Sequence, residues 1–231
     1  YKDSDSKEQG FFKSENRYEA KQDDFEKIPG SPIAYWVSDK VKNIFEKNKK
    51  LEEIAQPRAG MQTGDNNRFL RLWNEINLKE IGFNYSNRNQ VKTSNLKWFP
   101  YNKGGEFKKW YGNAETMLAF DEENYEILSN QGNHLPSKQY YFKPSITWSL
   151  ISSYSFGARK CNQGFVFDVG GSSAFTKEIN MNLILGLLSS KLSTIFLQAL
   201  NPTANMQVGD VASIPFLFSK IIEKEADIDS L

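Results

Sequence analysis

The run from 179 to 200 constrains the fold most, because it is the longest apolar stretch in the chain. A stretch of this length either spans a membrane or forms a helix inside a protein core. Polar residues interrupt it at many positions, namely Asn180, Asn182, Ser189, Ser190, Lys191, Ser193, Thr194 and Gln198. We therefore expect a buried helix over about 180 to 200 and no contact with a membrane. Pro202 cannot continue a helix and sets its end.

Length and composition predict a folded protein around this helix. The chain has 231 residues, of which 39% are hydrophobic, enough to bury one sizeable core or two small ones. Aromatic residues make up 14% of the chain, and such side chains supply both core area and stacking surfaces in binding sites. The composition alone does not distinguish between aromatic residues in the core and aromatic residues in a binding site.

The chain contains one cysteine and one histidine, which excludes several kinds of chemistry. Cys161 has no partner for an internal disulfide, and with His134 it cannot form a four-ligand zinc site. Neither a Ser-His-Asp nor a Cys-His arrangement is supported, so we expect no catalytic residues and no metal. A reducing compartment and the absence of a signal peptide at the start favour a cytoplasmic location.

A second helix is expected over about 32 to 55. Ser31 and Pro32 suit the cap and first turn of a helix. Apolar residues then recur at helical spacing, at Ile33, Trp36, Val37, Val41, Ile44 and Phe45. Residues 1–30 are charged and polar, and we expect a strand or arm laid on another surface.

Extended segments are expected in the second half of the chain. Runs at 140–142, 146–148 and 164–169 alternate with turn residues, which predicts a mainly antiparallel sheet. The segment 211–218 contains Pro215 and predicts a short edge strand. The fold class is thus α+β, with mainly antiparallel mixed sheets, a long N-terminal helix and a long helix near the C-terminus.

The charges point to a local rather than a global attraction for nucleic acid. The net charge is only +1, so any such site must come from local segregation of cations. The window 58–111 is rich in arginine and lysine, with interleaved aromatic residues, asparagine and glutamine. That mixture suits a surface that reads bases, and it suits equally a solvated sheet face over an aromatic core.

A turn at 62–68 sets up the two arginines that favour DNA contact. Gly64 and Asp65 precede Arg68 and Arg71, which would share one face if a helical turn follows. Paired guanidinium groups bind phosphate oxygens or guanine edges in a bidentate manner. The alternative is a capped turn whose arginines form surface ion pairs.

Two glycine pairs and one acidic motif are candidates for other chemistry. The pairs 104–105 and 170–171 lack the spacing of a nucleotide-binding loop, so β-turns are favoured, although either pair could touch a DNA phosphate. Glu106 and Lys108 match half of a metal-dependent nuclease site. That nuclease is the enzymatic alternative.

Nearly the whole chain resembles one family when its motifs are taken in order. It resembles the C-terminal specificity region of the adenine-specific methyltransferases of the BREX phage-defence type, the PglX family. It is more distantly similar to the TaqI-like specificity domain of restriction-modification enzymes. The resemblance rests on Ile-Pro-Gly-Ser-Pro-Ile-Ala-Tyr-Trp-Val at 28–37, Gly-Met-Gln-Thr-Gly-Asp-Asn at 60–66, Trp-Phe-Pro-Tyr-Asn-Lys-Gly-Gly-Glu-Phe at 98–107, Lys-Trp-Tyr-Gly-Asn at 109–113, Tyr-Phe-Lys-Pro-Ser-Ile-Thr-Trp-Ser at 141–149, Leu-Asn-Pro-Thr at 200–203 and Gln-Val-Gly-Asp at 207–210.

The resemblance implies a module that grips duplex DNA while a methyltransferase domain flips the target adenine into its own pocket. The family's S-adenosylmethionine glycine motif and Asn-Pro-Pro-Tyr motif have no counterpart here. We therefore expect a non-catalytic piece without a cofactor, and S-adenosylmethionine in the missing catalytic domain. The implied partners are double-stranded DNA, the N-terminal methyltransferase domain of the same chain and other defence-system proteins. The implied division is an arm at 1–30, a recognition domain at 31–218 and the start of a truncated helix at 219–231.

The expected DNA contacts come from loops across this region. The side chains expected to touch phosphates or bases are Thr63, Asp65, Asn66, Arg68, Arg71, Asn102, Lys103, Lys108, Lys143, Thr147, Arg159 and Ser172. A further alternative is a protein-docking module, in which the two predicted helices mainly contact other components of a defence complex.

Overall fold

The structure is a computed structural model, and its architecture is α+β, as the sequence predicts. It describes residues 2–15, 17–131, 134–152, 155–176 and 179–217.

Two four-stranded sheets organise these residues. The first is antiparallel throughout and has the order β1 (Gln56–Arg58), β8 (Ser173–Phe175), β5 (Ser145–Trp148) and β6 (Ala158–Cys161). The second has the order β2 (Leu70–Leu72), β4 (Thr116–Ala119), β3 (Trp98–Asn102) and β7 (Val166–Phe167), and only its β3–β7 pair is parallel. The expectation of mainly antiparallel mixed sheets is confirmed.

The helices are all short. The α-helices are α1 (Ser4–Phe12), α2 (Asp39–Lys47), α3 (Asn66–Phe69), α4 (Arg88–Lys92), α5 (Glu122–Asn130), α6 (Met181–Ser189), α7 (Lys191–Leu200) and α8 (Val208–Ala212). Single 3₁₀ turns lie at Gln22–Asp24, Leu51–Glu53, Trp73–Glu75, Leu78–Glu80 and Lys138–Tyr140.

The two sheets belong to two hydrophobic cores. Ile146, Trp148 and Ala174 of the first sheet face a core that α6, α7 and α8 close. Phe99 and Phe175 belong to the other core, around the second sheet. Because successive strand residues point to opposite faces, Ala174 and Phe175 join the two cores through β8.

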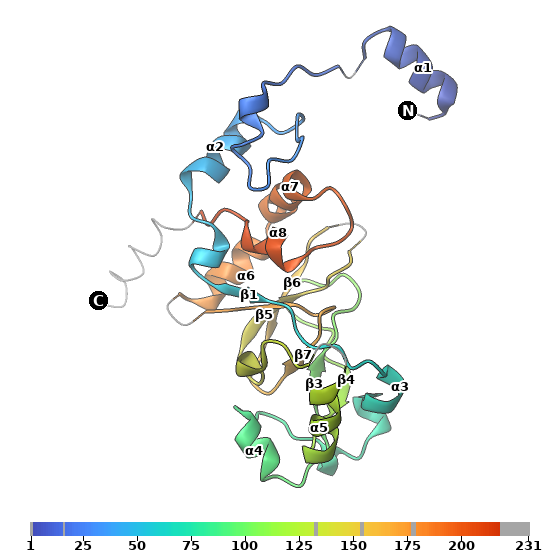
Figure 1. Ribbon diagram of the computed structural model, residues 1–231, viewed down its shortest axis with the longest axis vertical. Helices are drawn as coiled ribbons and strands as arrows, with labels where there is room; N and C mark the ends of the chain where they lie inside the picture. The colour runs from blue at the N-terminus through green and yellow to red at the C-terminus, as the bar shows by residue number, and fades with distance from the viewer. Residues whose placement is uncertain (1, 16, 132–133, 153–154, 177–178, 218–231) are drawn as a thin grey trace, which may run out of the picture.

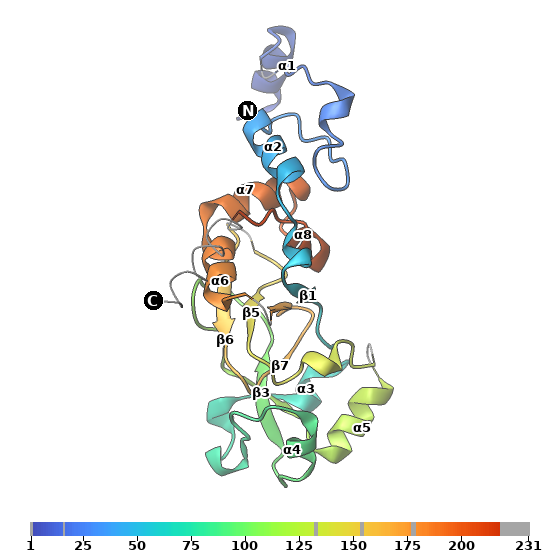
Figure 2. The same ribbon diagram turned by 90° about the vertical axis from the view of Figure 1, so that its left-hand side faces the viewer.

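The molecule is elongated (Figure 1). The helices α1 and α2 lie at one end, the first sheet with α6, α7 and α8 lies in the middle, and the second sheet with α3, α4 and α5 lies at the other end. Figure 2 shows the same order after a quarter turn. Loops that connect the two sheets therefore meet near the centre.

The predicted helix over 32–55 is wrong in extent, because only Asp39–Lys47 is α-helical and a single 3₁₀ turn follows at Leu51–Glu53. The side chains of Ile33 and Trp36 are 73% and 48% exposed, so the apolar spacing there does not mark a core-facing helix. Within residues 1–30, Ser4–Phe12 forms a helix capped by Asp3 and not a strand, and the division into an arm at 1–30 stays a prediction.

The predicted helix over 180–200 is two helices. Their axes bend by 70° between α6 and α7. Ser190 has an extended backbone, and its hydroxyl donates to the carbonyl of Leu187 at 2.7 Å. Such side-chain capture of a carbonyl competes with helical bonding and ends α6. Among the described residues, no single helix is long and apolar enough to cross a membrane, although this bent pair meets that length and composition test jointly.

Two predicted strands also differ from the structure. The segment 211–218 begins inside the helix α8, and Pro215 makes only an isolated antiparallel bridge to Lys50. The segment 140–142 begins in the 3₁₀ turn Lys138–Tyr140 and continues as a turn instead of forming a strand. Residue 218 and the predicted truncated helix at 219–231 lie outside the described residues.

Candidate nucleic-acid interface

The structure separates the predicted contact residues into two groups by exposure. The first group is exposed or partly exposed and consists of Asp65, Asn66, Arg68, Arg71, Lys103, Lys108 and Lys143. The second group is buried and consists of Thr63, Asn102, Thr147, Arg159 and Ser172. A buried side chain offers no surface to a base or phosphate in this conformation, so the second group holds the fold or underlies a cavity.

Asp168 connects two of the loops that meet near the centre. Its Oδ2 accepts hydrogen bonds from the Tyr101 hydroxyl at 2.6 Å and from Lys103 Nζ at 2.7 Å. Its Oδ1 accepts from the backbone N–H of Gly170 at 2.7 Å. Asp168 is buried, but the side chain of Lys103 is 36% exposed. The ion pair thus fixes the ammonium group of a lysine whose side chain is still partly exposed.

Burial also fixes the protonation of Tyr101. Desolvation, together with the charge of Asp168, raises the pKa of the Tyr101 hydroxyl well above its usual value. Tyr101 therefore stays a donor to Asp168 at neutral pH. The pair holds the end of β3 against the loop that follows β7.

Asn66 joins this cluster to α3. Its Oδ1 accepts from the Thr63 hydroxyl at 2.6 Å and from Lys103 Nζ at 3.4 Å. The structure thus brings two neighbouring predicted residues, Thr63 and Asn66, together with Lys103, which lies 37 positions after Asn66. Thr63 is buried and orients Asn66, whereas Asn66 itself is exposed.

A second polar network holds the glycine turns together. Asn102 Nδ2 donates to Thr147 Oγ1 and to the carbonyl of Gly171 at 2.9 Å, and Thr147 Oγ1 donates to the carbonyl of Ser172 at 3.0 Å. A Cβ at Gly104 would lie 2.1 Å from the carbonyl oxygen of Gly170. The two glycine turns therefore pack against each other, and this close approach requires glycine.

The helix α3 presents the two arginines differently from the prediction. The Asp65 side chain accepts from the N–H of Arg68 at 3.0 Å and caps a helical turn, as expected. The turn ends at Phe69, however, so Arg71 lies in β2 and not on the same helical face. Both arginines are exposed, and neither forms an ion pair with another described residue.

Aromatic rings support both guanidinium groups. Arg68 lies 5.2 Å from the centroid of Phe69, and Arg71 lies 5.9 Å from that of Trp98. Arg71 also donates to the carbonyls of Asn67 and Leu70, both at 2.6 Å. We call the exposed group Asn66, Arg68, Arg71 and Lys103 the α3 surface.

The remaining predicted lysines lie apart from the α3 surface. Lys108 pairs with Glu115 at 3.7 Å. Lys143 lies 5.4 Å from the ring of Tyr140, and Arg58 lies 5.6 Å from the same ring. Arg58 belongs to the basic window, but its position beside Lys143 around one tyrosine was not predicted, because the two residues are far apart in the chain.

The structure adds no residue to the nuclease alternative. Glu106 is exposed, and Lys108 is engaged with Glu115. Within the described part of the chain, no three His, Cys, Asp or Glu side chains lie close enough together to hold a metal ion.

The fold and the site define a two-core α+β protein with an exposed surface of cations, amides and supporting aromatic rings. The chain is 40% identical over 207 residues to the adenine-specific methyltransferase PglX of Lacticaseibacillus casei (strain Zhang), covering 86% of this chain and 17% of that protein. It is 35% identical over 206 residues to the adenine-specific methyltransferase BrxX of Escherichia coli O9:H4 (strain HS), covering 87% of this chain and 16% of that protein. No family model matches.

The chain is therefore homologous to a segment of the PglX and BrxX adenine-specific methyltransferases, which confirms that resemblance. It spans about a sixth of the length of the curated relatives that it matches. The more distant likeness to a TaqI-like specificity domain stays a prediction.

Proposed function

We propose that this chain binds duplex DNA and reads its sequence as the specificity region of an adenine-specific DNA methyltransferase. The similarity to PglX and BrxX supports the methyltransferase setting. The observation that carries the DNA-binding role is the α3 surface, where Arg68 and Arg71 are exposed, supported by rings and not paired with an acidic side chain among the described residues.

The α3 surface offers both kinds of contact that DNA recognition needs. Arg68 and Arg71 suit bidentate bonds to a guanine edge or to a phosphate. Asn66 suits an acceptor on a base edge through its Nδ2 donor, because its Oδ1 already accepts from Thr63 and Lys103. The ammonium group of Lys103 is paired with Asp168, and its other N–H donors suit a phosphate oxygen.

The chemistry belongs, in this proposal, to the rest of the protein. A methyltransferase domain of the same chain would hold S-adenosylmethionine and receive the target adenine after it leaves the helix stack. This segment supplies no methyl-transfer group and positions the DNA. The setting is a restriction-modification or phage-defence system in the cytoplasm, where other defence proteins are the further partners.

Removing two charges from the α3 surface tests the proposal. We expect Arg68→Ala with Arg71→Ala to weaken binding to duplex DNA about tenfold or more. Each phosphate contact that the substitutions remove should lower the slope of log affinity against log salt by about 1. Fluorescence anisotropy with labelled duplexes at several salt concentrations measures both quantities.

A matched control removes two positive charges at the opposite end of the molecule. Lys13 and Arg17 follow α1, which lies far from α3 (Figure 1). Lys13→Ala with Arg17→Ala has the same net charge as the α3 variant and is expected to bind DNA like the unmodified chain. Equal affinity and equal salt slope for all three proteins would contradict the proposal.

A further inference from the structure

Three large aromatic side chains are exposed within five residues of one loop. Phe107 is 45% exposed, Trp110 56% and Tyr111 73%. We call residues 107–111 the aromatic loop. Side chains of this size usually supply buried area, so their joint exposure in one short segment marks a surface that contacts another molecule.

Hydrogen bonds to the first sheet and to α6 hold the aromatic loop in this position. The N–H of Trp110 donates to the carbonyl of Ala158 at 2.8 Å, and the carbonyl of Trp110 accepts from the N–H of Lys160 at 2.9 Å. Lys109 Nζ donates to the carbonyl of Ser189, at the end of α6, at 2.8 Å. The loop is therefore anchored on two sides, and the exposure of its aromatic side chains is built into the fold.

The backbone of the aromatic loop is strained at Trp110. Its φ is +72°, in the left-handed region that bulky residues rarely adopt. The N–H of Tyr111 donates to the carbonyl of Lys109 at 2.9 Å and closes a three-residue turn around Trp110. Strain of this kind clusters at functional sites and persists where the surrounding contacts maintain it. The strained turn thus supports a binding role for this loop.

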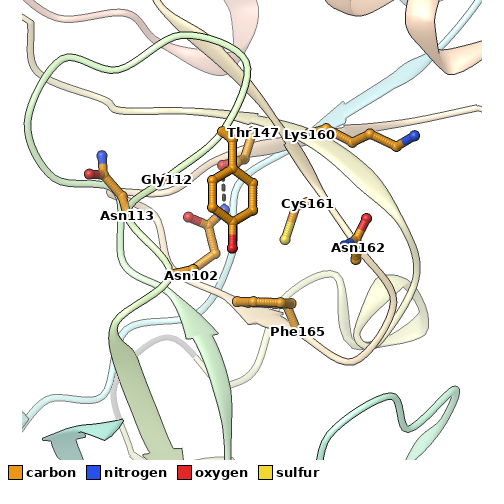
Figure 3. A pocket seen from close by; sticks show the side chains of 10 residues that line it. Asn102, Gly112, Asn113, Thr147, Lys160, Cys161, Asn162 and Phe165 are labelled. Carbon is orange, nitrogen blue, oxygen red and sulfur yellow. Dashed lines mark hydrogen bonds between the residues drawn. The ribbon is translucent and has the colours of Figure 1, made fainter. Parts of the chain in front are cut away.

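A cavity lies beside Tyr111. It comprises about 380 Å³ of empty space, part of it open to solvent, and the residues that line it include Tyr111, Asn102, Asn113, Asn162 and Phe165. Figure 3 shows Asn113 and Asn162 on opposite sides of the cavity, with Asn102 and Phe165 between them. An exposed aromatic ring therefore borders a space that is edged by amide groups.

The amide groups of Asn113 and Asn162 have atoms available to a ligand. Asn162 is exposed, and its side chain makes no hydrogen bond with the described residues. Asn113 Nδ2 donates to the carbonyl of Glu106 at 2.8 Å, which leaves its Oδ1 as an acceptor. A nucleobase has a flat face that stacks on aromatic rings and a polar edge that pairs with amides. The ring and the amides together match that chemistry.

The charges near the aromatic loop favour an anionic strand. The loop and its neighbours carry three lysines and two glutamates, namely Lys108, Lys109, Lys160, Glu106 and Glu115. Lys160 is exposed and forms no ion pair with another described residue. Its side chain extends away from the cavity (Figure 3). It is therefore available to a phosphate beside a base at Tyr111.

The cavity also adjoins the α3 surface. Asn102 lines the cavity, and the next residue, Lys103, belongs to the α3 surface and donates to Asn66. A nucleic-acid strand at the α3 surface therefore lies close to the cavity. This proximity favours DNA over a protein as the molecule that covers Tyr111.

We propose that Tyr111 and the cavity beside it bind an unpaired base of a DNA strand, with the base stacked on the Tyr111 ring and a neighbouring phosphate at Lys160. The identity of the strand as DNA rests on the proposed function, whereas the stacking site does not. Only a base that has left the helix stack has a free face for Tyr111. The proposed function supplies such a base, because flipping of a target adenine leaves the opposite base unpaired.

Two labelled oligonucleotides test this site by fluorescence anisotropy. One is a thymidine strand of about 12 nucleotides, and the other is a duplex with one unpaired base. We expect Tyr111→Ala to weaken binding to both by about fivefold to a hundredfold, the loss of one stacked base. Its affinity for a fully paired duplex should change less than about twofold, since such a duplex offers no unstacked base.

Three further variants identify the contact. Tyr111→Phe keeps the ring and should bind both oligonucleotides like the unmodified chain, whereas Tyr111→Leu is apolar without a ring and should bind like Tyr111→Ala. Tyr35→Ala is the matched control, because Tyr35 is 46% exposed and lies in the segment that precedes α2. It should leave both affinities unchanged. Lys160→Gln should lower the slope of log affinity against log salt for the single strand by about 0.7.

Equal affinity of Tyr111→Ala and the unmodified chain for both oligonucleotides would overturn the base site and leave the aromatic loop as a protein-contact surface. No binding of either oligonucleotide by the unmodified chain would overturn it as well. The fully paired duplex separates the two proposals, because the α3 variant should lose affinity for it and Tyr111→Ala should not. Tyr111-dependent binding of the single strand without any binding of the paired duplex would keep the base site and contradict the proposed function.

Discussion

Asp168 links the end of β3 to the loop that follows β7 through hydrogen bonds of its carboxylate. It is buried and accepts three hydrogen bonds, two of them from the side chains of Tyr101 and Lys103. Its charge strengthens these bonds, because charge-assisted hydrogen bonds are about twice as strong as neutral ones. Removal of that charge should reduce stability even where DNA binding is little changed.

Asp168→Asn should lower the free energy of unfolding by about 1.5 to 3 kcal/mol, since it removes the charge and turns one acceptor into a donor that faces other donors. Urea unfolding followed by circular dichroism measures this change. Asp65→Asn is the control, because asparagine caps a helix as well as aspartate does and should cost less than about 0.5 kcal/mol. Equal stability of the two variants would contradict the role given to Asp168.

The Cys161 thiol should be unreactive in the folded chain. Burial raises its pKa from 9.0 to about 12, against the opposing effects of Ser145 and the charge of Arg159. Little thiolate then exists at pH 8, and the thiolate is the reactive form. Because the folded pKa is the higher one, its contribution to stability is complete below about pH 9 and is lost as the pH rises towards 12.

Labelling with a chromogenic disulfide at pH 8 measures this reactivity. We expect a rate at least about a hundredfold slower for the native chain than for the chain in urea. Labelling of the native chain as fast as in urea would show that the thiol is neither buried nor protonated.

For single residues, the sequence predicted the exposure of some contact residues correctly and that of others wrongly. Asp65, Arg68 and Lys103 are predicted from a turn and a local charge pattern, and all three reach the surface. Thr147 and Arg159 are expected at a surface, but both side chains are buried on one face of the β5–β6 pair. A single sequence does not reveal that a polar strand face is covered by another part of the chain.

Alanine substitutions at two glycines, Gly157 and Gly186, test how closely neighbouring segments pack. A Cβ at Gly157 would lie 2.6 Å from the backbone oxygen of Lys108 and 2.9 Å from the ring of Phe107, whereas a Cβ at Gly186 meets nothing within 4 Å. Gly157→Ala should therefore lower the free energy of unfolding by about 1 to 3 kcal/mol, by forcing the segment at 107–110 away from β6.

Gly186→Ala should raise the free energy of unfolding by about 0.5 to 1 kcal/mol, because alanine favours the helix α6. Chemical unfolding of both variants under one set of conditions gives the comparison. Destabilisation by both substitutions to the same extent would mean that contact at Gly157 is not the cause.

For the elements, the sequence predicted where helices occur more reliably than where each helix begins and ends. Apolar spacing located the helical regions around 39–47 and 181–200 but joined segments that the structure separates. The break at Ser190 depends on a hydroxyl bond to Leu187, and the early end of α2 at Asn48 on an amide bond to the carbonyl of Ile44. Such bonds depend on side-chain conformation and leave no signal in hydrophobic periodicity.

For the whole molecule, a net charge of +1 makes the location of the cations decisive. Long-range attraction to DNA is weak for such a chain, so binding must rest on local contacts at the α3 surface. The elongated shape places the α3 surface towards the end opposite α1 and α2 (Figure 2). Contact with a methyltransferase domain and contact with DNA can thus occupy different parts of the molecule.

Selection of bound duplexes from a random pool by the purified chain, at low and at physiological salt, tests whether this segment reads DNA. We expect enrichment of one short sequence motif, with overall retention that falls steeply as salt rises, because phosphate contacts release counterions. Retention without an enriched motif would contradict sequence reading. Absence of retention at both salt concentrations would contradict DNA binding by this segment.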